Sequence, residues 1–279
     1  MILRVFESSD AQAVGKGHIE HLPKLNPLEI ECHLYIPPQV VTFERVITCV
    51  HGISRNALEQ LLFYRHHADQ LGLVLVVPLF DHEHFRNYQS LGFKNGYQRA
   101  DFSFNRLLNT LACKFNTPAL KTHLIGYSGG GQFAHRWAMG FAERLLSLHI
   151  CSPGWYTFPS PKHAYPRGIK FPQGRPLGYH PDPQRLLDIP VQLLVGDQDT
   201  LRDRSLNTNK EIDAQQGRNR YVRAQNWFDT MHRFAAKQGR KWHAELEVMP
   251  DQSHSFSENM RVGNMGQRIV AFIQSRFPE

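Results

Sequence analysis

The chain of 279 residues is long enough for one α/β domain with a single hydrophobic core, or at most two small ones. Its 41% hydrophobic and 20% charged residues are typical of a globular protein and exclude bulk disorder. No window is apolar enough to span a membrane, residues 1–15 lack the apolar region of a signal peptide, and the net charge is +7, so we expect a cytoplasmic protein without a membrane partner.

Short apolar runs alternate along the chain with stretches of helical periodicity. The apolar runs predict strands at residues 3–7, 29–36, 45–50, 73–77, 121–125, 148–151, 191–195 and 244–249. If residues 8–28 hold only loop, the first two strands form an antiparallel pair. The helical pattern predicts helices at residues 57–70, 101–114, 131–145, 219–238 and 263–277, the second capped by Asp101. This alternation predicts an α/β fold, with a mostly parallel central sheet covered by helices on both faces.

In such a sheet, functional sites lie at the carboxyl ends of the strands. Four loops leave that edge, after Val50, Ile125, Val195 and Met249. The last three of these loops carry a serine, an aspartate and a histidine, and the first begins with His51-Gly52. We therefore expect the four loops to form one site.

A Gly-x-Ser-x-Gly motif stands between the strand at 121–125 and the helix that follows it. A serine on so tight a turn takes a strained backbone conformation, which exposes the Ser128 hydroxyl above the sheet. Strand and helix nearly touch there, so the positions two before and two after must be small, as Gly126 and Gly130 are. The motif also fits a turn that only packs a strand against a helix, but its context favours Ser128 as a nucleophile.

The loop over residues 78–99 is polar and aromatic, and it contains Asp81-His82-Glu83-His84. Two imidazoles with flanking carboxylates can chelate a metal ion, but on a loop they more often form a solvated rim. We expect the solvated rim and no metal site.

Nine of the seventeen prolines fall between Pro153 and Pro190, which excludes regular helix and predicts a stiff, irregular insertion over residues 152–190. The position of this insertion is that of a lid over the site, within a single domain that spans residues 1–279. Its aromatic residues Trp155, Tyr156 and Phe158 leave the edge of the sheet together. We expect at least one of the three to line a substrate pocket, although they could equally anchor the loop to the core.

Ten Lys and Arg residues against four Asp and Glu residues lie between Arg202 and Lys241. The simplest interpretation is the solvated face of a covering helix; an acidic substrate and a nucleic-acid surface are the alternatives. No aromatic-interleaved module accompanies these charges, so we expect no nucleic-acid partner. The four cysteines include no Cys-x-x-Cys pair, which indicates neither a disulfide framework nor a zinc site.

The order Ser128, Asp199, His254 resembles the nucleophile, acid and base of the α/β-hydrolase superfamily. The resemblance runs from about Glu29 to the C-terminus. It includes the Gly126-x-Ser128-x-Gly130 motif, which resembles the nucleophile elbow of that superfamily, and the Gly196-x-x-Asp199 turn. His254 lies just before the final helix, as the family's histidine does. The run from His51 to Ala57, with its Gly-Tyr-Ser-Gly-Gly elbow, is similar to the polyhydroxybutyrate-depolymerase and feruloyl-esterase-like branch.

The chemistry of these residue types fits acyl transfer. A serine hydroxyl is too weak an acid to attack a carbonyl unaided, so His254 would take its proton while an acidic partner orients the imidazole. The oxyanion needs two N–H donors, for which we expect Gly129, the residue after the nucleophile, and Ile53 by the resemblance.

Several residues compete for the acid and base positions. Asp197 and Asp203 share the end of one strand with Asp199, and Asp251 precedes His254 by three residues. Asp199 stands on the crest of the turn and is our prediction, while Asp197 is expected to brace the turn by accepting from downstream amides. His254 could also be an ordinary loop histidine, and His232 and His243 are weaker candidates for the base.

The sequence therefore predicts a serine hydrolase that acts on a small-molecule carboxylic ester and needs no cofactor. The same residues could act on a thioester, an amide or a C–C bond, because the fold supports all of these reactions. A binding protein of the same fold without catalysis is the alternative from a different class. The oligomeric state is left open by the sequence.

Overall fold

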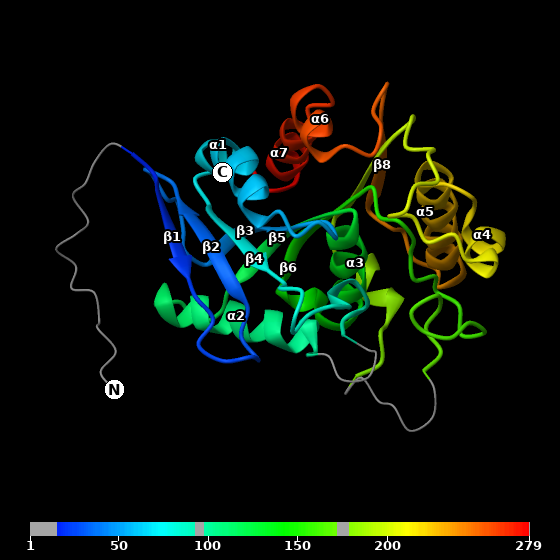
Figure 1. Ribbon diagram of the computed structural model, residues 1–279, viewed down its shortest axis with the longest axis horizontal. Helices are drawn as coiled ribbons and strands as arrows, with labels where there is room; N and C mark the ends of the chain where they lie inside the picture. Colours follow the sequence, from blue (N-terminus) through cyan, green and yellow to red (C-terminus); the bar gives the residue numbers. More distant parts are fainter. Residues whose placement is uncertain (1–15, 93–97, 172–178, 279) are drawn as a thin grey trace.

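The computed structural model describes residues 16–92, 98–171 and 179–278 (Figure 1). Within these residues the chain forms one eight-stranded sheet with the strand order β1-β2-β4-β3-β5-β6-β7-β8. The strands are β1 (His18–Leu22), β2 (Glu31–Ile36), β3 (Arg45–Val50), β4 (Val74–Leu79), β5 (Lys121–Tyr127), β6 (Leu145–Cys151), β7 (Val191–Gly196) and β8 (Ala244–Met249). β1 and β2, and likewise β2 and β4, pair antiparallel; all the other pairs are parallel.

Helices cover both faces of the sheet, and Figure 1 shows α1 and α7 on the opposite side from α2. The α-helices are α1 (Ala57–Leu71), α2 (Ala100–Lys114), α3 (Gly129–Phe141), α4 (Lys210–Gln216), α5 (Arg220–Lys237), α6 (Phe256–Arg261) and α7 (Met265–Arg276). Three 3-10 turns are η1 (Tyr88–Ser90), η2 (Ala142–Arg144) and η3 (Pro183–Leu187). None of the helices in the described ranges is long and apolar enough to cross a membrane.

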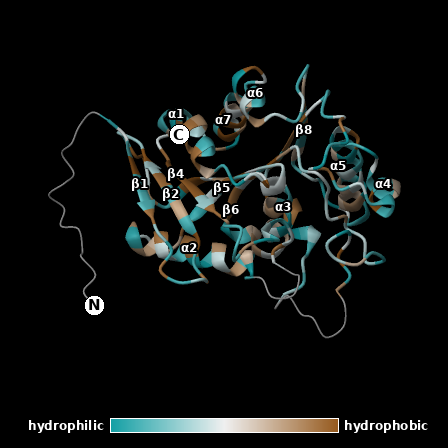
Figure 2. Cartoon of the chain, in the orientation of Figure 1, coloured by the Kyte–Doolittle hydropathy of each residue, from teal (hydrophilic) through white to brown (hydrophobic). Residues whose placement is uncertain are grey.

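The central strands are apolar throughout because each of their faces meets a helical layer. In β3, Val46 and Val50 belong to the core beneath α2, α3 and α5, whereas Ile47 and Cys49 belong to the core beneath α1, α6 and α7. Figure 2 shows the resulting hydrophobic interior of the sheet. This packing explains the nearly continuous apolar run from which the strand was predicted.

The predicted α/β architecture with a mostly parallel sheet is confirmed, and the strands at 45–50 and 244–249 have the predicted bounds. The condition for the expected opening pair, that residues 8–28 hold only loop, is not met, because His18–Leu22 forms the edge strand β1 and is the antiparallel partner of β2. Asp101 does not cap α2: it lies in the first turn, buried, and accepts hydrogen bonds from Arg99 and Tyr179. The strand predicted at residues 3–7 lies outside the described residues.

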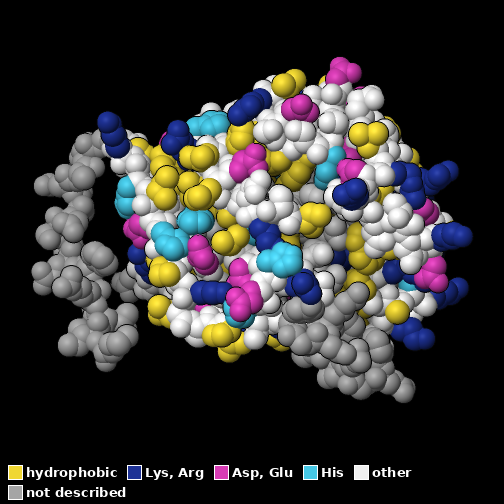
Figure 3. Space-filling model, in the orientation of Figure 1, with side chains coloured by type: hydrophobic (Ala, Val, Ile, Leu, Met, Phe, Trp, Pro, Cys, Tyr) yellow, Lys and Arg dark blue, Asp and Glu magenta, His cyan; other side chains and the backbone are white. Residues whose placement is uncertain are grey.

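The basic segment between Arg202 and Lys241 is only partly a solvated face. Figure 3 shows Lys and Arg side chains gathered over α4 and α5. Two arginines of α5 contradict the prediction, because the side chains of Arg220 and Arg223 are fully buried. Arg223 pairs with Asp213 at 2.7 Å and donates to the carbonyl of Gly154, and so joins α5 to α4 and to the chain after β6.

A chain of polar side chains crosses the parallel strands beneath α7. His123 of β5 donates from Nδ1 to Ser147 Oγ, the Ser147 hydroxyl donates to His149 Nε2, and His149 Nδ1 donates to Gln192 Oε1, each at 2.8 Å. The bond from the Ser147 hydroxyl requires His149 to be neutral, because a protonated Nε2 cannot accept. Burial lowers the pKa of His149 to about 4, and burial together with the His149 and Arg45 charges lowers the pKa of His123 to about 3.

We predict that acid destabilises the protein well above the range in which carboxylates titrate. In the unfolded chain both histidines take up protons near their ordinary pKa of about 6.5, while in the folded protein they stay neutral down to about pH 4. The unfolded state therefore binds more protons, and the free energy of unfolding falls as the pH drops from 6.5 to 4. The two sites together contribute a slope of up to ~2.7 kcal/mol per pH unit, which urea titrations between pH 7 and 4.5 measure.

The variant His149→Asn separates this effect from general acid sensitivity. Its absolute stability is lower, but its slope with pH should be shallower by the contribution of one histidine. An unchanged slope would show that His149 is already protonated in the folded protein.

Candidate active site

The turn between β5 and α3 holds Ser128 in a strained conformation with a φ of +53°. A Cβ on Gly126 would lie 2.3 Å from the carbonyl oxygen of Gly130, and one on Gly130 would lie 2.0 Å from the carbonyl oxygen of Val50. Any larger residue at either position would push the strand and helix apart. The Ser128 amide donates to the Cys151 carbonyl at 2.8 Å, which holds the strained turn against β6.

Three side chains from separate loops form a hydrogen-bonded line at the carboxyl edge of the sheet. Ser128 Oγ lies 3.0 Å from His254 Nε2, and His254 Nδ1 lies 2.8 Å from Asp199 Oδ2. The His254 ring stacks on the Tyr127 ring with centroids 5.4 Å apart, which fixes the plane of the imidazole. Asp199 is 1% exposed, whereas the His254 side chain keeps access to solvent.

Asp199 is held by a buried arginine that the sequence did not point to. Arg220, the first residue of α5, donates from Nη1 to Asp199 Oδ1 at 3.4 Å. Its Nη2 reaches Asp203 at 3.2 Å and the hydroxyl of Ser205. Partial burial raises the pKa of Asp203, but bonds from Ser205 and Arg220 outweigh it and bring the pKa to about 2. The arginine therefore lies between the carboxyl groups of Asp199 and Asp203.

The other two candidate carboxylates do not contact His254. Asp197 was expected to accept from downstream amides, yet its buried Oδ1 has no hydrogen-bond partner. Asp251 is exposed on the turn after β8, with a φ of +58°. The exits of β7 and β8 are tied together by the Gln198 amide, which donates to the Gln252 carbonyl at 3.0 Å, and this bond brings Asp199 close to His254.

The loop after β3 is organised by His51. The Phe80 amide donates to His51 Nε2 at 3.1 Å, so the ring proton lies on Nδ1, which donates to the Gly52 carbonyl at 2.8 Å. Burial lowers the pKa of His51 to about 4 and keeps the ring neutral. Because the Gly52 carbonyl turns toward His51, the N–H of Ile53 in the same peptide unit points the opposite way.

The Ile53 amide lies beside the start of α3. A Cβ on Gly129 would lie 3.2 Å from the Ile53 nitrogen, so the two backbone amides are neighbours. The first N–H groups of a helix have no intrahelical acceptor. The two predicted oxyanion donors, Ile53 and Gly129, are thus brought together next to Ser128.

Two further residues, Tyr88 and Arg55, connect this loop to the loop after β4. Tyr88 donates its hydroxyl to the His51 carbonyl at 2.8 Å and is fully buried. Arg55, with a φ of +60°, lies over the Tyr88 ring and donates to the carbonyl of Phe80. These contacts fasten the loop after β3 to the loop after β4, which explains why the latter is rich in aromatic residues.

Two adjoining hollows open beside Ser128. The first, of about 290 Å³, is lined by Ser128, His254, the His51–Ser54 loop and residues of α1 and α6. The second, of about 380 Å³, is lined mainly by polar side chains of η1, α3 and the loop at 204–207. Ile53 and Ser205 line both hollows and form the boundary between them.

The three aromatic residues of the proline-rich segment have different environments. Trp155 lines the second hollow, together with Pro166 of the same segment. Tyr156 and Phe158 are 1% and 6% exposed and belong to the core, where Tyr156 stacks on Trp227 of α5. These two residues fit the alternative of an anchor to the core, and Tyr156 contacts His135 of α3 as well as Trp227 of α5. The expectation that at least one of the three contacts a substrate now rests on Trp155 and stays a prediction.

The Asp81–His84 segment, considered as a metal site, is occupied by a cation of the protein itself. Lys24 Nζ lies 2.8 Å from Asp81 Oδ2 and 3.0 Å from His84 Nδ1. An ammonium group at this point repels a metal ion, so the segment is a salt-bridged rim. His232 and His243, the weaker candidates for the base, do not line either hollow.

Two comparisons found no match: no protein-family model and no curated protein matches the sequence. Solved structures do match. A poly(3-hydroxybutyrate) depolymerase, LpqC from Bordetella parapertussis, aligns with a TM-score of 0.77 and 25% identity over 96% of this chain and 94% of that chain. Poly(aspartic acid) hydrolase-1 from Sphingomonas sp. KT-1 aligns at 0.72 and 20% over 92% and 97%. A ferulic acid esterase aligns at 0.60 and 12% over 92% and 98%.

These alignments cover nearly the whole of this chain and of each matched chain. The chain has the α/β-hydrolase fold. The likeness to the depolymerase agrees with the branch that the His51–Ala57 run and the elbow suggested.

Proposed function

We propose that the protein is a serine hydrolase that cleaves a carboxylic ester through a Ser128–His254–Asp199 triad. The observation that carries the proposal is the continuous hydrogen-bonded line from the Ser128 hydroxyl through His254 to the buried Asp199 carboxylate. Each residue comes from a different loop, and no packing requirement explains why a nucleophile, a base and an acid meet at this edge. Neighbouring structures named as hydrolases and esterases support the same reaction class.

The reaction follows from the positions of the groups. His254 Nε2 takes the Ser128 proton as Oγ attacks the ester carbonyl carbon, and Asp199 stabilises the imidazolium that forms. The tetrahedral oxyanion accepts from the N–H groups of Ile53 and Gly129. His254 then protonates the leaving alkoxide as the C–O bond breaks, which leaves an acyl-enzyme. Water attacks this intermediate by the same route and releases the carboxylic acid.

The second hollow supplies the contact surface for the substrate chain, with Trp155 as the aromatic residue that touches it. The hollows beside Ser128 are small, and many of the side chains that line them are polar. A short, polar ester fits this lining better than a long aliphatic one. The mechanism uses only groups of the protein and a water molecule.

Replacing the nucleophile should abolish turnover without unfolding the protein. We expect Ser128→Ala to lose hydrolysis of p-nitrophenyl acetate and butyrate, because no other hydroxyl of the described residues is bonded to His254 Nε2. The wild-type protein should react with a fluorophosphonate probe at a single serine, identified by peptide mass spectrometry. The alanine variant should not react.

The control for this experiment is Ser257→Ala, since Ser257 lines the same hollow without bonding to His254. It should keep fluorophosphonate labelling at Ser128. A folded wild-type protein that neither labels nor turns over any ester would favour the non-catalytic binding protein.

The two aspartates at the end of β7 should behave differently. Asp199→Asn is expected to lower kcat by ~10⁴, because an amide favours the wrong tautomer of His254. Asp197→Asn makes the same chemical change two residues away, at a carboxylate that does not contact His254, and kcat should stay within about twofold of wild type. Steady-state kinetics at pH 7.5 measure both.

Loss of Asp199 also removes one partner of the buried Arg220, so folding must be checked by circular dichroism before the rates are compared. A rate loss in Asp197→Asn with nearly normal turnover in Asp199→Asn would transfer the acid role to Asp197.

A further inference from the structure

The second hollow contains an unusual distribution of charge. Its lining includes Arg204 and the amide side chains of Asn87, Gln89, Gln132 and Asn207, and none of the described residues that line it carries a carboxylate. Arg204 is exposed, and no described carboxylate pairs with it, whereas its neighbour Asp203 already pairs with Arg220. The hollow is therefore positive and rich in hydrogen-bond donors.

A second arginine lies buried behind this hollow without an acidic partner. Arg136 of α3 is fully buried and bonds only to neutral acceptors, the Thr157 hydroxyl, the Gln89 carbonyl and the Gln132 side chain. Its Nη2 is buried with no hydrogen-bond partner. Trp155 stacks on the guanidinium, with the Arg136 Cζ 4.4 Å from the ring centroid. Burial lowers the pKa of Arg136 to about 10, so the group keeps its charge at neutral pH.

Gln132 bonds to Arg136 and also lines the second hollow. Its Oε1 accepts from Arg136 Nη1 at 3.3 Å, so the N–H groups on its Nε2 point away from that arginine. A Cβ on Gly154 would lie 3.2 Å from this Nε2, which places the donor at the chain segment that borders Trp155. The backbone N–H of Gln132 donates to the Ser128 carbonyl at 3.1 Å, so Gln132 lies one helical turn from Ser128.

We propose that the second hollow is a subsite for a carboxylate group of the substrate, held by Arg204 and the Gln132 amide above the buried charge of Arg136. A buried cation without a counterion is costly unless a ligand supplies the negative charge, and a carboxylate fits the guanidinium and amide donors that face the hollow. The preferred substrates are then esters that carry a free carboxylate a few bonds from the scissile carbonyl. This inference rests on the proposed hydrolase function.

The test compares esters that differ only in charge. The monoethyl esters of succinic, glutaric and adipic acid are each paired with the ester whose free carboxylate is replaced by a carboxamide. Ethanol release gives kcat/KM for each pair. At one chain length or more, the anionic ester should exceed its carboxamide partner by about tenfold, the value of one charge-assisted hydrogen bond.

Two variants locate the effect. Arg204→Gln should lower the anionic-to-neutral ratio by several-fold, and Gln132→Glu, which keeps the acceptor for Arg136 but brings in a negative charge, should lower it further. Arg233→Gln is the matched control, because it removes the same charge from an exposed position on α5 that lines neither hollow.

Equal kcat/KM values within every pair would overturn the subsite, as would an equal loss in Arg204→Gln and Arg233→Gln. The carboxamide esters and fluorophosphonate labelling report the hydrolase itself. If both fail, the proposed function is wrong; if both succeed without a charge preference, only the subsite is wrong.

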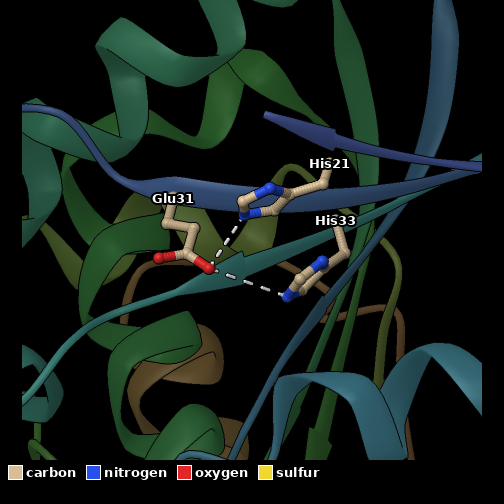
Figure 4. Close-up of side chains that lie close together, drawn as sticks. All are labelled: His21, Glu31 and His33. Atoms are coloured by element: carbon tan, nitrogen blue, oxygen red, sulfur yellow. Dashed lines mark hydrogen bonds and ion pairs between the residues drawn. The ribbon is translucent and has the colours of Figure 1, made fainter. Parts of the chain in front are cut away.

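A separate cluster on the edge of the sheet has the composition of a metal site. His21 of β1 and His33 of β2 are direct cross-strand partners, and Glu31 lies two residues before His33 on the same face (Figure 4). Glu31 Oε1 lies 2.9 Å from His21 Nε2 and 4.0 Å from His33 Nε2, and the three ligand atoms lie within 4.8 Å of one another. No described Lys or Arg pairs with Glu31.

We infer that these three side chains bind a divalent transition-metal ion, with Zn²⁺ as the probe. Two imidazoles and one carboxylate are preferred zinc ligands, and bonds of about 2.0–2.2 Å require only small side-chain rotations from the observed positions. A water molecule would complete a tetrahedral set. The ion would join the edge strand β1 to β2 at one end of the sheet, with β4 and β3 between this pair and β5, which Ser128 follows.

Titration of the tag-free, EDTA-treated protein with ZnCl₂ by calorimetry tests this site. We expect one ion per chain, and a Tm that rises by about 5 °C when free Zn²⁺ is a hundredfold above Kd. His21→Ala and His33→Ala should each weaken binding at least tenfold. The control is His18→Ala, which removes a histidine from the same strand that pairs with Glu20 alone.

No saturable binding, or unchanged binding in both His21→Ala and His33→Ala, would overturn the metal site. His21 is exposed, so its replacement should not disturb folding and keeps the test valid if His33→Ala is unstable.

Discussion

The close approach of β3, β5 and the start of α3 is the constraint on which the rest of the site depends. Only glycine fits where Gly126 meets Gly130 and where Gly130 meets the Val50 carbonyl. This contact forces Ser128 to a positive φ and places the Ile53 amide beside Gly129. The proposed nucleophile and the two proposed oxyanion donors are therefore positioned by one packing contact. The strain at Ser128 persists because β6 holds its amide through the Cys151 carbonyl.

The second organising interaction is the buried pair between Asp199 and Arg220. A carboxylate removed from water is costly unless it is paired and hydrogen-bonded, and Asp199 has His254 on one oxygen and Arg220 on the other. Arg220 also binds Asp203 and Ser205, and Ser205 lines both hollows. The position of Asp199, the proposed acid, is thus coupled to the loop that borders both hollows. Removal of Arg220 would leave a buried charge unpaired, a loss of ~3–5 kcal/mol in comparable pairs.

Much of the fold could be predicted because its signals are local. The run from Arg45 to Val50 is apolar on both faces, and the spacing of the glycines around Ser128 predicts the elbow. The short strand His18–Leu22 could not be recognised, since an exposed edge strand with two histidines and a glutamate lacks an apolar pattern. Arg220 and Arg223 were misjudged because burial of a charge depends on partners distant in sequence. For Arg136 a signal existed: it is a charge inside an otherwise buried helix.

The proline-rich segment shows how the same side chains divide between structure and recognition. Tyr156 and Phe158 face the core and anchor the described part of the segment around them, and Trp155 alone of the three aromatics faces a hollow. The surface that the proposed substrate would contact in the second hollow is therefore mainly polar, with amides, hydroxyls and an arginine. A site that binds its ligand through hydrogen bonds to buried groups strongly rejects analogues that lack the matching polar group. An apolar pocket discriminates much less between ligands that differ by one small group. Selectivity in this protein should accordingly follow the polar groups of the ester rather than the length of its carbon chain.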